Sequence, residues 1–179
     1  LINAICGIVP PSSGRVLIGG QVVADLAVHD VSRAGLGRTF QNIRLFKNLT
    51  VLENVRVAAN SVARPGEYTA AAARAALAVV GLTDLAPRLA VTLPYGAQRR
   101  LEIARALALS PRFLLLDEPA AGMNATEKAA LRELLEAIRR QGITILLIEH
   151  DVKLVMGLCD RIAVLDYGKK IAEGLPAEV

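Results

Sequence analysis

The sequence has few aromatic residues and no long apolar run. Aromatic side chains make up 3% of its 179 residues, and tryptophan is absent. Because there is no long basic block either, the composition argues against a nucleic-acid-binding protein, and we expect no nucleic-acid partner. No stretch approaches the roughly 20 apolar residues that cross a bilayer, and no basic-then-apolar leader with a cleavage site opens the chain. We therefore expect a soluble, intracellular protein.

Cysteine is also scarce. Cys6 and Cys159 lie far apart and lack Cys-x-x-Cys spacing or a histidine cluster, so a disulfide or metal site is not favoured. Both lie in apolar segments, and we expect buried, free thiols in a reducing compartment. The basic residues are scattered apart from the pairs Arg99–Arg100 and Arg139–Arg140, which we interpret as solvated surface.

In its second half the sequence alternates short apolar runs with amphipathic stretches. Residues 112–116 and 143–148 have the length and composition of buried strands, and 161–165 and 169–172 are further strands. Asn124 with Glu127 three residues on is a capping-box pattern that begins a helix, and 152–158 is also helical. Strands that alternate with helices predict a parallel sheet covered on both faces, hence an α/β fold.

The first half is richer in helix and loop. Residues 1–7 resemble the end of a helix, and two short strands flank Gly19–Gly20. A polar loop is predicted over 35–48. Thr50 with Glu53 begins a helix to about residue 59, and further helices are predicted over 70–80 and 97–109. The stretch from about 43 to 110 is therefore expected to form a helical lobe.

Two adjacent acids, Asp117 and Glu118, end the first buried strand in the sequence FLLLDEP. Ligands of open parallel sheets bind at the carboxyl ends of the strands. One carboxylate there can hold Mg²⁺, directly or through its water shell, while its neighbour orients or deprotonates an attacking water, as in phosphate-ester hydrolysis. A strand that runs into a turn with two solvated acids explains the same residues equally well.

The next strand ends in Glu149, His150 and Asp151, and its end should lie near Glu118. His150 could there contact a terminal phosphate oxygen; a purely structural hydrogen bond is the alternative.

Two weaker indications of a binding site lie earlier in the sequence. Gly96 stands where the helix over 97–109 begins and exposes backbone N–H groups that favour an anion, although an ordinary helix start needs no anion. The amide oxygen of Gln41 could ligate a metal or a water, although a surface loop explains it too.

In order and spacing these pieces resemble the ATP-binding cassette (ABC) family, the nucleotide-hydrolysing subunits of membrane transporters. Family landmarks fall along nearly the whole chain: the Q-loop at Gln41, the signature helix at LPYGAQRRLEIARAL, the Walker B strand at FLLLDEP, the D-loop at AAGMN and the switch histidine in IEHD. The resemblance implies an α/β P-loop NTPase (RecA-like) fold, with a mostly parallel sheet and an inserted α-helical lobe. Residues 1–42 would be a partial nucleotide-binding core ending in the Q-loop, 43–110 the lobe with the signature, and 111–179 the rest of the core.

The resemblance also implies roles and cofactors, namely ATP and Mg²⁺. Asp117 would support Mg²⁺, and Gln41 would link metal and water to the transmembrane partner. Glu118 would polarise the attacking water, and His150 would contact the γ-phosphate. The remaining motif residues are the signature residues Tyr95, Gly96 and Gln98, which would meet the nucleotide of a second subunit, and Asn124 of the D-loop.

Stretches such as GLGRTFQNIRLFKNLTVLENV look most like the ATP-binding subunits of branched-chain amino-acid importers, whose relatives carry amides, urea or other small polar solutes. The implied partners are transmembrane permease subunits, a second ATP-binding subunit in a homodimer or heterodimer and, indirectly, a periplasmic or extracellular solute-binding protein. The implied location is the cytoplasmic face of the plasma (inner) membrane, as a peripheral subunit.

Several positions depart from the family pattern. Amino-acid importers resemble this variant pattern, so we do not interpret it as loss of activity. The departures are Pro94 for the usual signature serine, Tyr95 for a glycine, Ala97 for the signature glutamine, and Asn124 for the aspartate of many D-loops.

The family's phosphate loop, GxxxxGK[ST], does not occur in the sequence, and neither does the upstream aromatic residue for adenine. Without that loop and its lysine most of the grip on phosphate is lost, so we expect this chain alone to bind ATP poorly and to hydrolyse little or none. The simplest explanation is an N-terminally truncated piece of a longer protein, shortened at its C-terminal end as well.

Two other functions compete with an importer ATPase. A non-catalytic ABC subunit could complete a composite ATP site on a partner, but such a subunit has little use for Glu118 and His150. A DNA-repair or chromosome ATPase carries a similar signature, but its domain is interrupted by long heptad coiled coils, which this sequence lacks.

Overall fold

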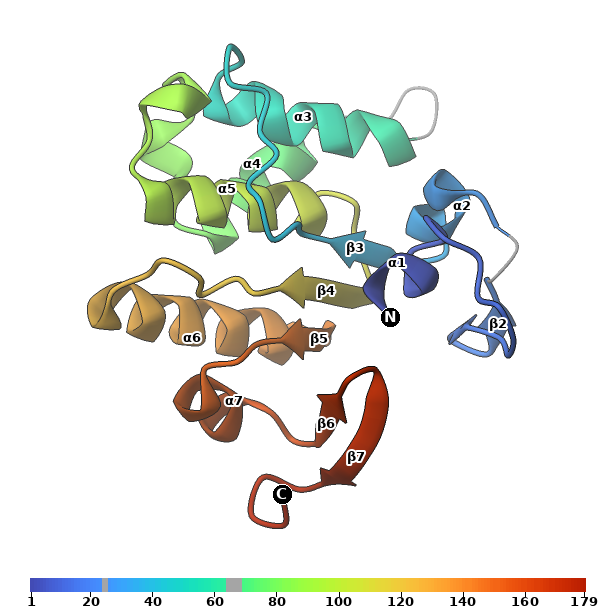
Figure 1. Cartoon of the computed structure of the whole chain (residues 1–179). Coiled ribbons are helices and arrows are strands. Elements are labelled where there is room, and N and C mark those ends of the chain that lie inside the picture. The colour runs from blue at the N-terminus through green and yellow to red at the C-terminus, as the bar shows by residue number, and fades with distance from the viewer. Residues whose placement is uncertain (24–25, 64–68) are drawn as a thin grey trace.

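The computed structural model describes residues 1–23, 26–63 and 69–179. At its centre lie three parallel strands in the order β3-β4-β5, formed by Leu36–Arg38, Phe113–Asp117 and Thr144–Ile148. In Figure 1 helices α3, α4 and α5 lie next to the β3 end of the sheet, and α6 and α7 lie next to β4 and β5. The parallel α/β core that the sequence predicts is therefore present.

The central strand β4 is buried on both faces. Leu114 and Leu116 belong to a large apolar core shared with helices α3 to α7, whereas Leu115 packs into a smaller core with α1, α2 and β1. All three side chains are 0% exposed, and burying each one contributes about 1.5–3 kcal/mol. This alternation fixes the register of β4 and so the position of the acids at its end.

The smaller core is covered by the first elements of the chain. Helix α1 (Ile2–Ile5) ends before Gly7, whose φ of +70° suits glycine. Strands β1 (Leu17–Ile18) and β2 (Gln21–Val22) form the antiparallel hairpin predicted around Gly19–Gly20. Helix α2 (Val28–Arg33) follows.

The helical side of the molecule contains α3 (Val51–Val62), α4 (Thr69–Val79) and α5 (Tyr95–Leu107), with 3₁₀ turns η1 (Thr83–Leu85) and η2 (Ala90–Thr92) between the last two. The predicted capping box of α3 is confirmed: the Thr50 N–H donates to Glu53 at 2.7 Å, and the Glu53 N–H donates to the Thr50 hydroxyl at 3.2 Å. The division of the chain at residues 42 and 110 stays a prediction.

Next to β4 and β5 lie α6 (Ala125–Arg140) and α7 (Val152–Leu158), followed in the sequence by the antiparallel hairpin of β6 (Ile162–Asp166) and β7 (Lys169–Gly174). The second predicted capping box, at the start of α6, is also confirmed. The apolar face predicted for α6 is buried, with Leu131, Leu134, Leu135 and Ile138 in the large core.

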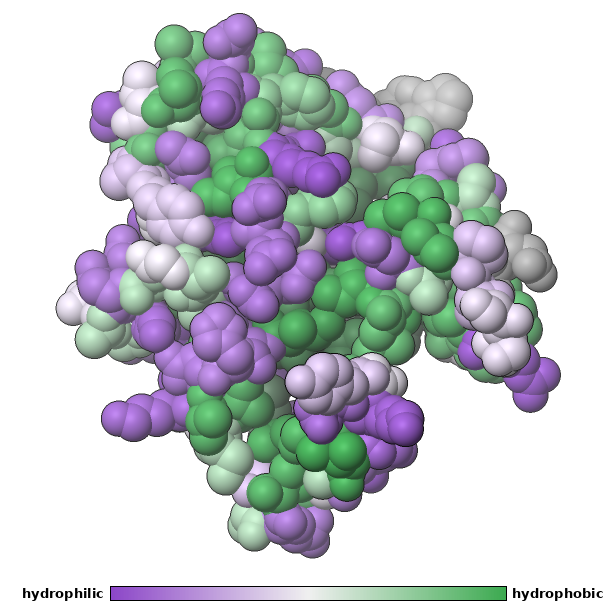
Figure 2. Space-filling view, in the orientation of Figure 1, coloured by the Kyte–Doolittle hydropathy of each residue, from purple (hydrophilic) through white to green (hydrophobic). Residues whose placement is uncertain are grey.

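Four expectations were wrong or incomplete. Strand β3 lies within the stretch predicted as loop, and α2 was not predicted. Strand β5 is half exposed rather than buried, with Leu146 45% exposed, because among the described residues it pairs only with β4. Within the described residues, strand β6 pairs with β7 and not with the parallel sheet. Figure 2 shows apolar side chains gathered in the hollow where Figure 1 places β4 and β5.

Both cysteines are free, as expected. Cys6 is buried and Cys159 half-buried, and burial raises the pKa of both thiols. Within residues 1–23, 26–63 and 69–179, no helix combines the length and the apolar character needed to cross a bilayer.

Candidate functional site

The ends of β4 and β5 meet, as the sequence predicts. Asp117 pairs with Ile148 in register, so the residues that follow each strand emerge at the same edge of the sheet. His150 Nδ1 lies 3.9 Å from Glu118 Oε1. The His150 side chain is 75% exposed and that of Glu118 30% exposed, so both are accessible to a ligand from solvent.

The backbone of Glu118 has a φ of +45°, in the left-handed region. A non-glycine residue rarely adopts this conformation, and a residue before proline favours extended backbone instead. The Glu118 N–H donates to the Ile148 carbonyl at 2.9 Å, which holds the turn in place. Conformational strain of this kind costs about 1–3 kcal/mol and clusters at functional sites.

Gln41 reaches the same carboxylate from the loop after β3. Its Nε2 donates to Glu118 Oε2 at 3.1 Å. Gln41 and His150 therefore lie beside opposite oxygens of Glu118, and the sheet brings together three residues that are widely separated in the sequence. The amide oxygen of Gln41 is left available as an acceptor.

The oxygen atoms at this edge suit Mg²⁺. Asp117, Glu118 and the Gln41 amide provide the hard oxygen ligands that this ion prefers, and Mg²⁺ bound with a nucleotide takes only one or two carboxylates from the protein. The described part of the chain holds no cluster of three or more histidine, cysteine or acidic side chains placed to bind a metal. The chemistry of these side chains is compatible with Mg²⁺, and an ion held here would take its remaining ligands from phosphate and water.

Glu149 organises the edge, a role that the sequence did not reveal. Its Oε1 accepts the Ala120 N–H at 2.8 Å, and its Oε2 accepts the His150 N–H at 3.2 Å. One carboxylate thereby ties the turn after Glu118 to the backbone of His150. No local pattern distinguishes this acid from a solvated one.

The predicted signature residues begin α5, and their described side-chain hydrogen bonds go to residues other than Glu118. The Tyr95 hydroxyl donates to the Ala121 carbonyl at 3.0 Å, and Gln98 Nε2 donates to the Leu93 carbonyl at 2.8 Å. A Cβ on Gly96 would lie 2.9 Å from a Glu127 oxygen, so a side chain there would crowd the start of α6. The first turn of α5 therefore packs against the segment that follows Glu118.

Asn124, the predicted D-loop residue, is the N-cap of α6. Its side chain accepts the Glu127 N–H at 3.0 Å, and Glu127 accepts the Asn124 N–H at 3.0 Å. The reciprocal bonds fix the end of the segment that begins at Glu118.

Arg99 is buried, which corrects the interpretation of Arg99–Arg100 as solvated surface. Arg99 is 3% and Glu102 4% exposed, and their side chains form an ion pair at 3.3 Å. Burial raises the pKa of Glu102, although hydrogen bonds from the Arg44 backbone and the charge of Arg99 oppose the shift. The sequence signal for this pair was the Arg-to-Glu spacing of three residues in a helix.

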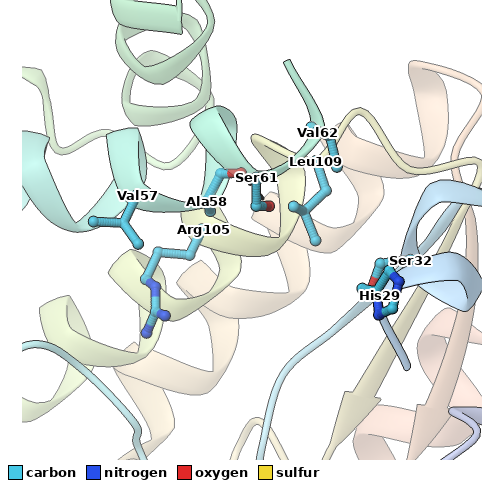
Figure 3. A pocket seen from close by; sticks show the side chains of 8 residues that line it. All are labelled: His29, Ser32, Val57, Ala58, Ser61, Val62, Arg105 and Leu109. Atoms are coloured by element: carbon cyan, nitrogen blue, oxygen red, sulfur yellow. Dashed lines mark hydrogen bonds between the residues drawn. The ribbon is translucent and has the colours of Figure 1, made fainter. Parts of the chain in front are cut away.

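Two adjoining cavities open between the sheet and the helices. One of about 430 Å³ is lined by the loop after β3, including Phe40, Leu45 and Phe46. The other, of about 300 Å³, lies between α2 and the α3 and α5 helices (Figure 3). The linings of the two cavities share Ala58, Arg105 and Leu109, and we name this part of the surface the groove.

Comparisons with known proteins identify the family. The family model described as ABC transporter matches residues 1–121. The chain is 40% identical over its whole length, and over 76% of the relative, to the high-affinity branched-chain amino acid transport ATP-binding protein BraF of Pseudomonas aeruginosa. The chain belongs to the ABC transporter family.

Solved structures place the fold in the same family. The ATP-binding cassette MJ1267 of an ABC transporter superposes with a TM-score of 0.88 at 30% identity, over 99% of this chain and 75% of MJ1267. The cassette MJ0796, in a dimeric post-hydrolysis state bound to ADP and phosphate, gives a TM-score of 0.86 at 26% identity, over 98% of this chain and 78% of its own. The predicted family and P-loop NTPase fold are confirmed, and this chain is an ABC ATP-binding domain.

Proposed function

We propose that the complete protein is the ATP-hydrolysing subunit of an ABC importer for branched-chain amino acids or similar small polar solutes. The observation that carries this proposal is the meeting of Gln41, Glu118 and His150 at the carboxyl edge of the parallel sheet. BraF, a relative over the whole chain, is an ATP-binding protein of branched-chain amino acid transport, which supports the class of cargo.

In this function Glu118 acts on the water. The Gln41 amide holds Oε2 at 3.1 Å, which leaves Oε1 to accept a proton from a water that attacks the terminal phosphate. His150 lies beside Oε1 and is exposed, so it can donate a hydrogen bond to a phosphate oxygen. Asp117 would hold Mg²⁺ with Gln41, and the bound ion supplies charge neutralisation on the phosphate oxygens.

The start of α5 would serve the nucleotide of a second subunit. Pro94 is the N-cap of this helix, and its side chain has no acceptor for the first N–H groups. Those groups and the helix dipole favour an anion. Tyr95, Gly96 and Gln98 would border that anion, with Asn124 of the D-loop near the same interface. MJ0796 forms a dimer, which supports pairing, here with an identical or a related chain.

The groove beside α3 and α5 would receive the membrane partner. Phe46 is 46% exposed at its rim, and the Arg105 guanidinium lies 4.9 Å above the Phe46 ring. A short amphipathic helix from a permease subunit could bury Phe46 and place an acid near Arg105. This contact would hold the protein at the cytoplasmic face of the membrane as a peripheral subunit, with a solute-binding protein acting from the other side.

The test uses the complete protein assembled with its permease subunits in vesicles. We expect ATP hydrolysis that requires Mg²⁺ and is stimulated by a loaded solute-binding protein, together with uptake of labelled leucine, isoleucine or valine. Hydrolysis with uptake of an amide or urea alone would reassign the cargo within the proposal. Absence of hydrolysis from the assembled complex, despite nucleotide binding, would instead support a non-catalytic subunit.

A further inference from the structure

Three segments that carry different motifs meet at the buried side chain of Arg99. They are the loop that holds Gln41, the first turn of α5 with Tyr95, and the segment after Glu118. Among the hydrogen bonds that the structure describes, Arg99 bonds directly to the loop of Gln41 and to Tyr95. Tyr95 in turn bonds to the segment after Glu118.

The donors of Arg99 are divided among these partners. Nη1 donates to the Phe40 carbonyl at 2.7 Å, and Nη2 donates to the Gln41 carbonyl. Nε donates to the Tyr95 hydroxyl at 3.3 Å, and that hydroxyl donates to the Ala121 carbonyl at 3.0 Å. Only a guanidinium provides so many donors in one rigid plane.

The Glu102 carboxylate accepts hydrogen bonds from backbone N–H groups of the same loop. Its Oε1 accepts from Phe40 at 3.3 Å and from Arg44 at 3.4 Å, and its Oε2 faces Arg99 Nη1 at 3.3 Å. The backbone on both sides of Gln41 is therefore bound to one turn of α5 through carbonyl and amide groups alike.

Stability alone does not account for this arrangement. A buried ion pair stabilises a fold no more than well-packed apolar residues of the same volume, because desolvation offsets the attraction between the charges. What the pair does supply is a fixed position for the backbone to which it bonds. The side chain of Gln41 in turn bonds to Glu118.

We propose that Arg99, fixed by Glu102, is a positioning residue that sets the place of Gln41 against Glu118 and ties it to the first turn of α5. The proposal rests on the hydrolytic role proposed for Glu118. It implies that a displacement of α5 moves the Gln41 backbone with it, so that the first turn of α5 and the water-binding edge shift together.

The decisive comparison is between Arg99→Lys and Arg100→Lys in the complete protein. Lysine keeps the charge but cannot reach all partners of Arg99. Arg100 is the matched control because it lies next in the same helix and donates to the Val80 carbonyl at 3.2 Å, within the helical side of the molecule. Glu102→Gln, which is nearly isosteric, is the second variant should Arg99→Lys fail to fold.

The first readout needs no nucleotide. Hydrogen exchange of the peptide covering 40–44 should become about tenfold faster or more in Arg99→Lys, because the Phe40 and Gln41 carbonyls lose their donors. Glu102→Gln should have the same effect, because its amide N–H group replaces the oxygen that faces Arg99 Nη1 and so displaces the guanidinium. Arg100→Lys should leave it unchanged. Equal exchange in all three variants would overturn the proposal, whatever the ATPase activity of the protein.

The second readout is steady-state ATP hydrolysis. In Arg99→Lys we expect kcat to fall about tenfold or more while KM for ATP stays within about twofold, because misplacement affects the reacting geometry. In the background of Gln41→Ala, Arg99→Lys should add no further loss. A fully additive loss would show that Arg99 does not act through Gln41. A wild-type complex without hydrolysis would refute the proposed function. The hydrogen-exchange result would still test whether Arg99 positions the loop of Gln41.

Discussion

Gln41 Nε2 donates to Glu118 Oε2 at 3.1 Å across a separation of 77 residues. The bond joins the loop after β3 to the end of β4, and His150 lies 3.9 Å from the other oxygen. The Glu118 carboxylate is therefore held by Gln41 at one oxygen and lies beside His150 at the other, which distinguishes it from a solvated acid in a turn.

Glu118→Gln in the complete, assembled protein should abolish turnover while ATP binding survives. The amide keeps the shape of the side chain but cannot accept the proton of the attacking water, and loss of a general base costs about 100-fold or more. The measurement is steady-state phosphate release, beside equilibrium binding of ATP with Mg²⁺.

Glu133→Gln is the matched control for that change, since Glu133 is an exposed acid on α6. It should leave turnover unchanged. Turnover within about threefold of wild type in Glu118→Gln would remove Glu118 from the role of general base, given the size expected for such a group.

Phe46→Asp should weaken assembly with the permease subunits and leave the fold intact. Phe46 is 46% exposed at the rim of the groove, so a charge there costs the domain little but opposes burial against a partner. The amount of permease that co-purifies should fall at least about tenfold if the ring is a buried anchor. Val91→Asp, at a residue 53% exposed outside the groove, serves as the control. Equal assembly in both variants would place the permease contact elsewhere.

Asn54→Ala should destabilise the domain by about 1–3 kcal/mol, because it leaves buried backbone groups without partners. The side chain is fully buried, accepts the Phe46 N–H at 2.9 Å, and donates to the Phe46 and Thr50 carbonyls at 3.0 Å each. Urea unfolding gives the free energy, with exposed Asn60→Ala on the same helix as the comparison. A loss no larger than that of Asn60→Ala would mean that the loop before α3 finds other partners.

Asp151 should make the stability of the fold depend on pH on the acid side. Lys128 Nζ lies 2.6 Å from its Oδ2, and this hydrogen bond, with that from the Leu154 N–H, lowers the pKa of Asp151. A carboxyl whose pKa is lower in the folded state stabilises the fold above its unfolded pKa of about 3.9, and the contribution disappears as the pH falls through the folded value.

Asp151→Asn isolates this effect, because asparagine is as good an N-cap for α7 but carries no charge. The variant should have a lower urea midpoint than wild type at pH 6, and the two midpoints should converge below about pH 4. A difference that stays constant from pH 7 to pH 3 would exclude the titration of Asp151 as its cause.

Features determined by neighbouring residues could be predicted from the sequence. Both capping boxes, at Thr50 with Glu53 and at Asn124 with Glu127, depend on side chains three residues apart, and both are present. The meeting of Glu118 and His150 could also be predicted, because the carboxyl ends of adjacent parallel strands share one edge.

Features created by contacts between residues far apart in the sequence could not be predicted. Strand β3 contains a glycine and an arginine in three residues and exists because it pairs with β4. The burial of Arg99 depends on carbonyl groups 58 and 59 residues away, so the local sequence alone predicts an exposed arginine. Glu149 likewise acquires its role only when the turn after Glu118 folds beside it.

The free side of β5 has a practical consequence for anyone who handles residues 1–179 alone. Within the part of the chain that the structure describes, this strand bonds to β4 on one side only, and Leu146 is 45% exposed. Its sequence, TILLI, holds no charge and no proline, and such an edge recruits strands from other molecules. Self-association in a concentrated preparation would then reflect strand pairing at this edge and not the pairing of ATP-binding subunits proposed above.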